Sequence, residues 1–519
     1  MTLQITRKRF IESSAAVGGG LAIGGPLAAL AAQSAHGAPG SSPGYGPLQP
    51  TPEQDTGFTF LALPRGFRYR LISKEGDPSF VVDEDGNRTQ APTPGIFDGM
   101  AAYAVGKRDD DDDDDRRGRA GRKAKVILIR NHENRERADE IPFAIPPDKR
   151  YDPSPATGNA GNTKLLVGAD RRVIETFQVL AGTSTNCAGG ETPWDSWITS
   201  EEVFKPGGAF GHGYNFEIPS GPNAPTQAIP IRRAGRFSHE AVSWLDQVLY
   251  ETEDRSQPTS FATTPPGAPS PLPAGYGGGG FYRYLPGRKI TRSGQLADSN
   301  GRLEMLGVKG QPNRDMDSVN PGETLPVVWY PIADPEPADD NPPNGVRFQG
   351  QNQGAASFGR PEGSWVGDGK VYFSCTAGGE AGLGQLWEFD PRGRRGGGEG
   401  SITLVYESDD ITKLEGPDNV VFVPKTGDVF LQEDASGDQF VRGVTEEGRI
   451  YDFAQTIAND TEFCGGCFSP DGKTFFLNQQ GNRLGGDASE AEIREGGALT
   501  YAIWGPFSRR KGKGDRDDD

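Results

Sequence analysis

Short hydrophobic runs alternate with glycine- and proline-rich turns along most of the chain. Aromatic and β-branched residues dominate these runs, which is typical of β-strands. Nearly all of them follow a turn of the Asp-Gly type. The pattern predicts an all-β fold with strands at Val126–Ile129, Val248–Glu251, Gly280–Leu285, Val371–Ser374, Gln385–Phe389, Val429–Gln432 and Thr474–Asn478.

Three of the runs share a local form in which a glycine turn leads into a strand, at residues 367–373, 425–431 and 471–477. Their spacing of roughly 45 to 60 residues suits a propeller blade, in which a four-stranded sheet is repeated around an axis. A pair of β-sandwiches is the alternative. Strand-like runs and turns alternate throughout the chain and no linker divides it, so we expect a decorated β-propeller.

Low-complexity segments interrupt the strand pattern and predict loop insertions at about residues 107–125 and 256–276. The first holds an aspartate run, which we interpret as a solvated loop because contiguous aspartates repel one another and lack the spacing of a calcium loop. We expect a single β-propeller domain with loop insertions over residues 55–507. A flexible segment at 39–54 and a charged, disordered tail at 508–519 are expected to flank it.

The first residues, 1–38, are expected to be a cleavable export leader. A basic cluster, Arg7-Lys8-Arg9, precedes a weakly apolar run from Ala15 to Ala32. Arg7-Lys8 stands where a twin-arginine signal carries its pair, and Phe10 follows. An ordinary Sec leader is the alternative, because both export routes use the same regions. We expect a periplasmic or extracellular protein, moved by the twin-arginine machinery and without a membrane anchor in its mature form.

The chain is acidic, with a formal net charge of −18. This negative charge disfavours nucleic acid as a partner. An anionic substrate would need local positive charge from metal ions or a placed arginine. Four cysteines are too few for a disulfide scaffold. Cys464 and Cys467 form a CxxC motif, for which a local disulfide or two buried thiols is the interpretation, whereas Cys187 and Cys375 stand alone.

Three histidines lie in dense polar clusters, at His132, His212 and His239. A His-Glu pair occurs twice without the HExxH spacing, so the sequence disfavours a zinc protease. Carboxylates are more informative, because Cys187 is followed by a doubled glutamate at Glu201 and Glu202. Clustered carboxylates suit hard cations, and a thiolate beside them suits a transition metal such as iron. Acidic surface clusters and a buried free cysteine are the alternative explanation.

A set of motifs resembles the PhoX family of secreted alkaline phosphatases. The motifs are Asp98-Gly-Met, Arg130-Asn-His-Glu133, Asn186-Cys-Ala-Gly-Gly-x-Thr-Pro-Trp194, Glu201-Glu202, His212-Gly-Tyr-x-Phe-Glu217, His239-Glu240, Tyr250-x-Thr-Glu-Asp254, Arg360-Pro-Glu-Gly363, Thr376-Ala-Gly-Gly379, Gly416-Pro-Asp-Asn419, Ser469-Pro-Asp-Gly472 and Ile503-Trp-Gly-Pro-Phe507. They occur in the family's order over residues 55 to 507. The set is specific, although no single string is.

The resemblance implies a decorated six-bladed propeller that carries Fe(3+) and Ca(2+) on its axis and hydrolyses phosphate monoesters at alkaline pH. By resemblance, Cys187 is the iron-binding thiolate, Arg360 holds phosphate, and Glu362 is a catalytic metal carboxylate. The implied metal ligands are Cys187, Glu201, Glu202, Glu240, Glu251, Glu253, Asp254 and Glu362. Asn131, His132 and Glu133 match a motif to which we assign a structural or supporting role.

This assignment agrees with the charge of the substrate, because a metal cluster and an arginine fork can neutralise a phosphate monoester. The sequence departs from the family after Trp197, where Ile-Thr-Ser-Glu-Glu-Val lacks the cysteine that often precedes the glutamate pair and the asparagine that often follows it. Two alternatives stay open: a phosphodiesterase or other ester hydrolase on the same scaffold, and a non-catalytic calcium-binding extracellular propeller. The expected partner is a small phosphate ester, and a monomer is expected.

Overall fold

The computed structural model describes residues 43–105, 124–137, 140–206, 210–258, 264–392, 399–481 and 497–508. The predicted leader at 1–38, most of the predicted insertion at 107–125 and most of the charged tail lie outside these residues. Strands dominate the described part, in which the α-helix α3 (Val346–Gln351) spans six residues. No described helix combines the length and apolar character that a membrane span requires. The prediction of an all-β fold is confirmed.

Residues 78–219 build two sheets. The first is six-stranded, in the order β5-β4-β9-β8-β7-β6, and the second is three-stranded, in the order β10-β11-β12. Their strands are β4 (Pro78–Val82), β5 (Arg88–Pro92), β6 (Phe97–Ala104), β7 (Ala124–His132), β8 (Ala160–Gly168), β9 (Val173–Thr183), β10 (Asn186–Glu191), β11 (Ser196–Glu201) and β12 (Asn215–Pro219).

The middle of the chain forms a nine-stranded sheet that consists of two antiparallel meanders joined edge to edge. The first meander is β13 (His239–Leu245), β14 (Val248–Glu253), β15 (Phe281–Leu285), β16 (Arg302–Val308) and β17 (Thr324–Pro331). The second is β18 (Pro361–Gly367), β19 (Lys370–Cys375), β20 (Gln385–Asp390) and β21 (Ser401–Glu407). The join is short, because β17 pairs with β21 only over Thr324 to Pro326.

Two further sheets combine strands from both ends of the described chain. A six-stranded sheet has the order β1-β2-β25-β24-β23-β22, and a four-stranded sheet has the order β26-β27-β28-β3. The strands are β1 (Leu48–Thr51), β2 (Leu61–Pro64), β3 (Arg68–Lys74), β22 (Pro417–Phe422), β23 (Val429–Glu433), β24 (Phe440–Val444), β25 (Ile450–Thr456), β26 (Phe463–Phe468), β27 (Thr474–Gln479) and β28 (Leu499–Trp504).

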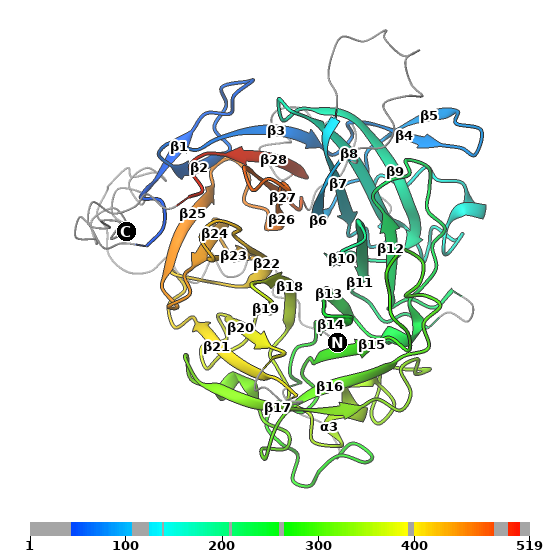
Figure 1. Ribbon diagram of the computed structural model, residues 1–519, viewed down its shortest axis with the longest axis vertical. Helices are drawn as coiled ribbons and strands as arrows, with labels where there is room; N and C mark the ends of the chain where they lie inside the picture. The colour runs from blue at the N-terminus through cyan, green and yellow to red at the C-terminus, as the bar shows by residue number, and fades with distance from the viewer. Residues whose placement is uncertain are drawn as a thin grey trace, which may run out of the picture. The chain divides into compact units, whose positions relative to one another are not determined.

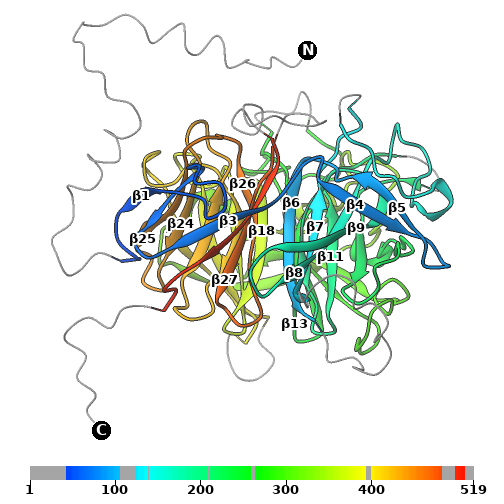
Figure 2. The ribbon, with the colours of Figure 1, turned by 90° about the horizontal axis from the view of Figure 1, so that it is seen from above.

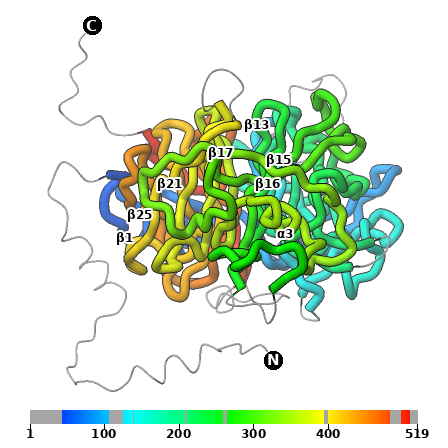
Figure 3. Tube along the Cα trace, turned by 90° about the horizontal axis from the view of Figure 1, so that it is seen from below, coloured from blue at the N-terminus to red at the C-terminus, as the bar shows by residue number. Residues whose placement is uncertain are grey.

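The sheets stand around a central axis in a propeller-like arrangement (Figure 1), and a side view shows them next to one another (Figure 2). The strands nearest the axis are β6, β10, β13, β18, β22 and β26, which we call the inner strands. Each contacts the next, and β26 contacts β6. The ring is closed by pairing of the early strand β3 with the late strand β28, in which Leu71 is opposite Tyr501. The joined edges β17 and β21 lie on the outside (Figure 3).

Small residues let the inner strands approach one another closely. A Cβ atom on Gly99 would lie 2.5 Å from the Cα of Ala188, and a Cβ on Gly363 would lie 2.6 Å from the Cα of Asn419. Real Cβ atoms do not approach backbone atoms this closely, so these positions require glycine. The apolar cores lie further out, between the faces of neighbouring sheets and between the two meanders of the nine-stranded sheet.

The predicted hydrophobic runs all coincide with strands, and only Gly280 of these runs lies outside, directly before β15 (Phe281–Leu285). The three glycine-turn repeats lead into β19, β23 and β27, each of which is the second strand from the axis in its sheet. One prediction is wrong in part: Leu48–Thr51, inside the segment expected to be flexible, forms β1 and pairs with β2. This strand contains Pro50 and has no hydrophobic run, so its backbone pairing rather than its side chains places it at the sheet edge.

Candidate metal centre

Every inner strand has a carboxylate or a thiol at its second residue. These residues are Asp98 on β6, Cys187 on β10, Glu240 on β13, Glu362 on β18, Asp418 on β22 and Cys464 on β26. All of them are buried. The pairing of each inner strand with the next strand shifts register just after this position. Bulges of this kind re-aim side chains and are common beside active sites. We call these residues the axial ring.

A backbone hydrogen bond recurs above each member of the axial ring. The N–H of the residue after the second strand donates to the carbonyl oxygen of the residue before the inner strand. The pairs are Glu133 to Ile96, Glu202 to Thr185, Asp254 to Ser238, Thr376 to Arg360, Asp434 to Gly416 and Gln480 to Glu462, with N···O distances of 2.8 to 3.2 Å. We call the side chains of these pairs the rim.

Three non-glycine residues of the rim adopt left-handed backbone angles: Ile96, Thr185 and Arg360 have φ values of 50°, 53° and 55°. This conformation is strained for such residues, above all for the β-branched pair. The repeated hydrogen bond fixes it. The strain is therefore concentrated where the side chains surround the axis.

The ring and the rim together form three groups of residues whose potential ligand atoms lie within 4.8 Å of one another. The groups are Glu133 with Cys187 and Glu202, Glu240 with Glu362 and Asp418, and Asp98 with Glu462 and Cys464. Oxygen donors suit hard cations such as calcium, and thiolates suit transition metals. The composition of the three groups therefore fits a mixed metal centre.

The electrostatics of the ring also fit bound cations. Burial, followed by the charges of Glu362 and Asp418, raises the pKa of Glu240 well above its usual range. Burial and the nearby Asp434 raise the pKa of Asp418 to about 7. Both carboxylate oxygens of Glu240 are buried without a hydrogen-bond partner among the described residues. A buried carboxylate in this state is costly unless it is protonated or binds a cation.

Two arginines and one glutamine contact the carboxylates. Arg360 lies 2.6 Å from Oε1 of Glu362 through Nη2 and also pairs with Asp254. Arg135 pairs with Glu133. The side-chain amide of Gln480 donates to Asp98 at 3.1 Å, to Glu133 at 2.7 Å and to Glu462 at 2.8 Å. These contacts fix the orientation of the acidic groups.

The structure brings together six of the residues predicted for the site. Cys187, Glu240 and Glu362 are in the axial ring, and Glu202, Asp254 and Arg360 are in the rim. Cys187 has its thiol 3.5 Å from Oδ2 of Asp98. Burial and the charge of Asp98 raise the pKa of this thiol well above its usual range.

Three predicted ligands lie apart from these groups. Glu201 accepts hydrogen bonds from the backbone N–H groups of Ser184, Gly213 and Tyr214, and its Oε1 is 2.7 Å from Nδ1 of His212. The ligand assignment of Glu201 gains no support from this geometry.

The other two predicted ligands, Glu251 and Glu253, are two residues apart on β14 and therefore lie on the same face of that strand. Glu251 accepts from Asn215 at 2.8 Å and lies 3.2 Å from Nδ1 of His239. Glu253 accepts from Tyr282 at 2.5 Å and pairs with Arg347 at 3.1 Å. Both oxygens of Glu253 contact protein groups, whereas Oε1 of Glu251 is buried without a hydrogen-bond partner among the described residues. Of the three acidic residues at this strand end, only Asp254 belongs to the rim.

The motif Arg130 to Glu133 contributes two kinds of residue. Asn131 donates to the carbonyl oxygens of Cys187 and Ala188 at 2.7 and 2.6 Å, which supports its predicted structural role. His132 bonds to the Gly95 carbonyl and the Thr163 hydroxyl. Glu133 differs from expectation, because it is grouped with Cys187 and Glu202 rather than only supporting them.

Sequence reasoning missed Asp98, Asp418, Glu462 and Cys464 as site residues. A signal was present: each ring residue is followed by a small or short residue, in Asp98-Gly, Cys187-Ala, Glu240-Ala, Glu362-Gly, Asp418-Asn and Cys464-Gly. Insertions of different length between the sheets obscure a fixed period. The possible Cys464–Cys467 disulfide is not formed, since all four cysteines are free and buried.

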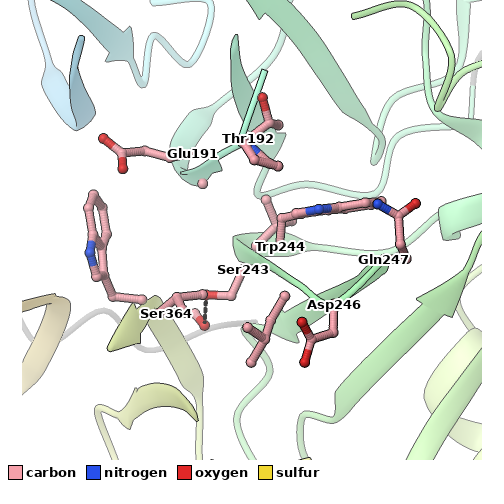
Figure 4. Close-up of a pocket in the computed structure, with 13 residues that line it drawn as sticks. Glu191, Thr192, Ser243, Trp244, Asp246, Gln247 and Ser364 are labelled. Atoms are coloured by element: carbon pink, nitrogen blue, oxygen red, sulfur yellow. Dashed lines mark hydrogen bonds between the residues drawn. The ribbon is translucent and has the colours of Figure 1, made fainter. Parts of the chain in front are cut away.

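A cavity of about 630 Å³ lies at the far ends of β10, β13 and β18, away from the axial ring. Glu191, Trp244 and Asp246 are among its lining residues, and the Ser243 and Ser364 hydroxyls bond to each other at 2.8 Å beside it (Figure 4). None of its lining residues belongs to the three groups. Trp365 lines this cavity and also the smaller one behind the ring.

The family model of alkaline phosphatase PhoX matches residues 43–164, 148–268 and 276–482. The chain belongs to the PhoX family of alkaline phosphatases. The resemblance of its motifs is thereby confirmed, and membership makes the chain a phosphatase. The PhoX family is metal-dependent, in agreement with the carboxylate clusters. No curated protein matches the sequence.

The chain is similar to several solved structures, and the likeness to a PhoX structure supports the fold. Pseudomonas fluorescens PhoX in complex with vanadate, a transition state analogue, is 16% identical, with a TM-score of 0.60 over 90% of this chain and 99% of that one. The WD40 β-propeller domain of Doa1 is 9% identical, with a TM-score of 0.34 over 85% of this chain and 98% of that one. A Trichoderma reesei carbohydrate-active enzyme of family AA12 is 12% identical, with a TM-score of 0.32 over 77% and 97%.

Proposed function

We propose that this PhoX-family protein is an exported enzyme that hydrolyses phosphate monoesters at alkaline pH with a centre of Fe(3+) and Ca(2+) on the axis of a six-bladed propeller. One observation carries the metal centre: Glu240 is fully buried with both oxygens unpartnered among the described residues, beside Glu362 and Asp418. A carboxylate so placed fits a cation. The recurrence of the ring residue and the rim hydrogen bond on every inner strand supports six blades.

The donor sets suggest which metal each group would hold. Cys187, with Glu133 and Glu202, would hold iron, because it combines a thiolate with carboxylates. Glu240, Glu362 and Asp418 offer oxygen atoms alone and would hold calcium. When bound, such ions neutralise charge on the phosphate and activate an oxygen nucleophile.

Arg360 would grip the substrate. Its side chain is 32% exposed, whereas Asp254 and Glu362 beside it are 11% and 4% exposed. The guanidinium is therefore reachable from solvent while its partners are covered. A planar fork can donate two hydrogen bonds to phosphate oxygens. Asp254 and Glu362 hold the fork in place before the substrate arrives, which lowers the ordering cost of binding.

Export is supported by the predicted twin-arginine leader at residues 1–38 and by membership of a family of exported phosphatases. Twin-arginine export moves folded proteins, so a mixed metal centre could assemble before the chain meets competing ions. A monomer is part of this proposal. A leader-fused reporter tested in cells that lack the twin-arginine translocase would separate this route from Sec export.

The function is tested by measuring iron and calcium in the exported protein and assaying p-nitrophenyl phosphate beside bis-p-nitrophenyl phosphate from neutral to alkaline pH. We expect both metals and a higher kcat/KM for the monoester. Preference for the diester would favour a phosphodiesterase on this scaffold. Absence of iron, with no hydrolysis after reconstitution, would falsify the proposal and favour a calcium-binding propeller.

A further inference from the structure

Cys464 and Cys187 occupy equivalent places on either side of Asp98. Each is the second residue of its inner strand, and the strands β26 and β10 both contact β6, which carries Asp98. The Cys187 thiol is 3.5 Å from Oδ2 of Asp98. The Cys464 thiol lies within 4.8 Å of a carboxylate oxygen of Asp98 and of one of Glu462. Two sulfur atoms therefore flank one buried carboxylate.

The second cysteine of the CxxC motif has a different environment. Cys467 follows the bulge in β26, is paired with Phe476, and packs in an apolar cluster with Met100 and Leu128. Both cysteines are fully buried and free. The bulge thus separates a thiol that faces carboxylates from a thiol that faces hydrocarbon. Their spacing in the sequence does not reflect a shared role.

The six ring residues divide into two chemical halves. In order around the axis, Cys464, Asp98 and Cys187 form one half, and Glu240, Glu362 and Asp418 form the other. Thiolates select transition metals, whereas carboxylates alone suit calcium. The unpartnered oxygens of buried Glu240 point independently to a bound cation in this ring. Gln480 holds Asp98 and Glu462 through one amide nitrogen, at 3.1 and 2.8 Å.

We propose that Cys464 is a second thiolate ligand of the metal centre and forms, with Asp98 and Glu462, a transition-metal site beside that of Cys187. This inference rests on the proposed function, which requires a metal centre but assigns sulfur ligation only to Cys187. The Cys464 thiol donates to the Phe97 carbonyl oxygen at 3.0 Å. Binding replaces that hydrogen by the metal and releases one proton to solvent, because the ligand is the thiolate.

The test compares Cys464→Ala, Cys187→Ala and the double variant with Cys467→Ala, which removes a buried thiol from the same strand but not from the ring. Each full-length exported protein is loaded with Co(2+), and the thiolate-to-cobalt charge-transfer absorption is measured per bound ion. We expect Cys464→Ala to lose roughly half of the wild-type absorption, the double variant to lose all of it, and Cys467→Ala to keep it. Sulfur coordination numbers from X-ray absorption of the iron-loaded protein should follow the same order.

The outcomes separate this inference from the proposed function. If Cys464→Ala matches Cys467→Ala while Cys187→Ala abolishes the absorption, Cys464 is not a ligand and the proposed function stands. If wild type and Cys467→Ala bind no transition metal, both proposals fail. Circular dichroism checks the fold of each variant. Cys464→Ser, which preserves the size of the side chain, replaces Cys464→Ala in the comparison if the alanine variant does not fold, and the same loss is expected.

Discussion

Arg360 holds Asp254 in a two-point contact in which Nε donates to Oδ1 at 2.9 Å and Nη2 donates to Oδ2 at 3.0 Å. Arg360 directly precedes β18 and Asp254 directly follows β14, and the two residues are 106 positions apart in sequence. The negative charge of Glu362, with a smaller contribution from Asp254, raises the pKa of Arg360. Burial alone would lower it, but its effect is outweighed. The guanidinium is therefore a fixed cation at the exposed side of the candidate metal-binding groups.

Replacement of Arg360 should weaken catalysis without emptying the metal centre. We expect Arg360→Ala to lower kcat/KM for a monoester by about 100- to 1000-fold, the usual effect of losing one donor to a developing anion. Arg360→Lys should recover little, because an ammonium group cannot form the planar fork. Steady-state kinetics with metal analysis of the same samples checks this. Full activity of either variant would show that the arginine assignment is wrong.

The adjacent residues Glu201 and Glu202 should respond differently to the same change. Glu201→Gln weakens the contacts of this side chain with His212 and with three backbone N–H groups, so we expect a loss of about 1–3 kcal/mol in the free energy of unfolding and unchanged metal content. Glu202→Gln removes a carboxylate grouped with Cys187 and Glu133, so we expect less bound iron and little loss of stability in the metal-free protein. Each variant is the control for the other in denaturant unfolding and metal analysis.

This contrast shows which part of the site the sequence could predict. The doubled glutamate was recognisable, but side chains alternate sides along a strand, and which of two neighbours faces the axis depends on where β11 ends. The same limit applies to Glu251, Glu253 and Asp254 at the end of β14. Asp98 meets Glu462 and Cys464 only because the ring closes where β26 contacts β6, and Asp418 meets Glu240 and Glu362 only because three inner strands lie side by side. The small residue after each ring position marks the position but does not indicate these long-range contacts.

The fold could be predicted from the sequence better than the site, because strands have local signals whereas the site depends on long-range contacts. A glycine turn followed by a hydrophobic run is a local signal, and every run so identified is a strand. The strand β1 is held by pairing with β2, and β3 by pairing with β28 at the other end of the described chain. The residues of β1 and β3 do not indicate with which strands they pair. Local turn chemistry thus predicted seven of the 28 strands in the described residues, whereas pairing between strands places others such as β1 and β3.

Removal of the metals should destabilise the protein more at alkaline than at acidic pH. Burial and mutual repulsion raise the pKa values of Glu202, Glu240 and Glu362 in the metal-free fold. A carboxyl group with a raised pKa favours the folded state while it is protonated, and this stability is lost as pH rises through the folded-state pKa. Bound cations remove this penalty.

The measurement is the midpoint of thermal unfolding with and without chelator at mildly acidic and at alkaline pH. We expect the drop caused by the chelator to be larger at alkaline pH. Glu362→Gln, which removes one of the charges, should reduce the drop. A drop of equal size at both pH values would contradict ionisation of the buried ring as its cause.

The pKa of Asp317, a residue outside the axial ring, leads to a second prediction about pH and stability. Burial, followed by the charge of Asp315, raises its pKa to about 7, although Gly359 N–H donates to it at 3.1 Å. Since the folded state holds the proton more tightly than the unfolded state, stability should fall as pH rises from about 4 to about 7. Asp317→Asn should flatten this part of the profile. Denaturant unfolding at a series of pH values checks it, and an unchanged slope would refute the assignment.

Close approach of the inner strands should be as important for the metal centre as the ligands. A Cβ on Gly363 would lie 2.6 to 2.8 Å from three backbone atoms of Asp418, Asn419 and Val420, which cannot move aside as a side chain could. Gly363→Ala should therefore push β18 from β22 and separate Glu362 from Asp418. We expect a loss of about 1–3 kcal/mol in the free energy of unfolding, together with weaker calcium binding.

Gly437→Ala is the matched control for this substitution, because a Cβ there meets no atom within 4 Å. Its effect on stability should stay within about 0.5 kcal/mol, and calcium binding should be unchanged. Calcium titration by calorimetry and unfolding in urea measure both quantities for each variant. If Gly363→Ala lost stability but bound calcium as tightly as Gly437→Ala, the spacing of β18 and β22 would govern folding alone, and the oxygen ligands would not depend on how closely those strands pack.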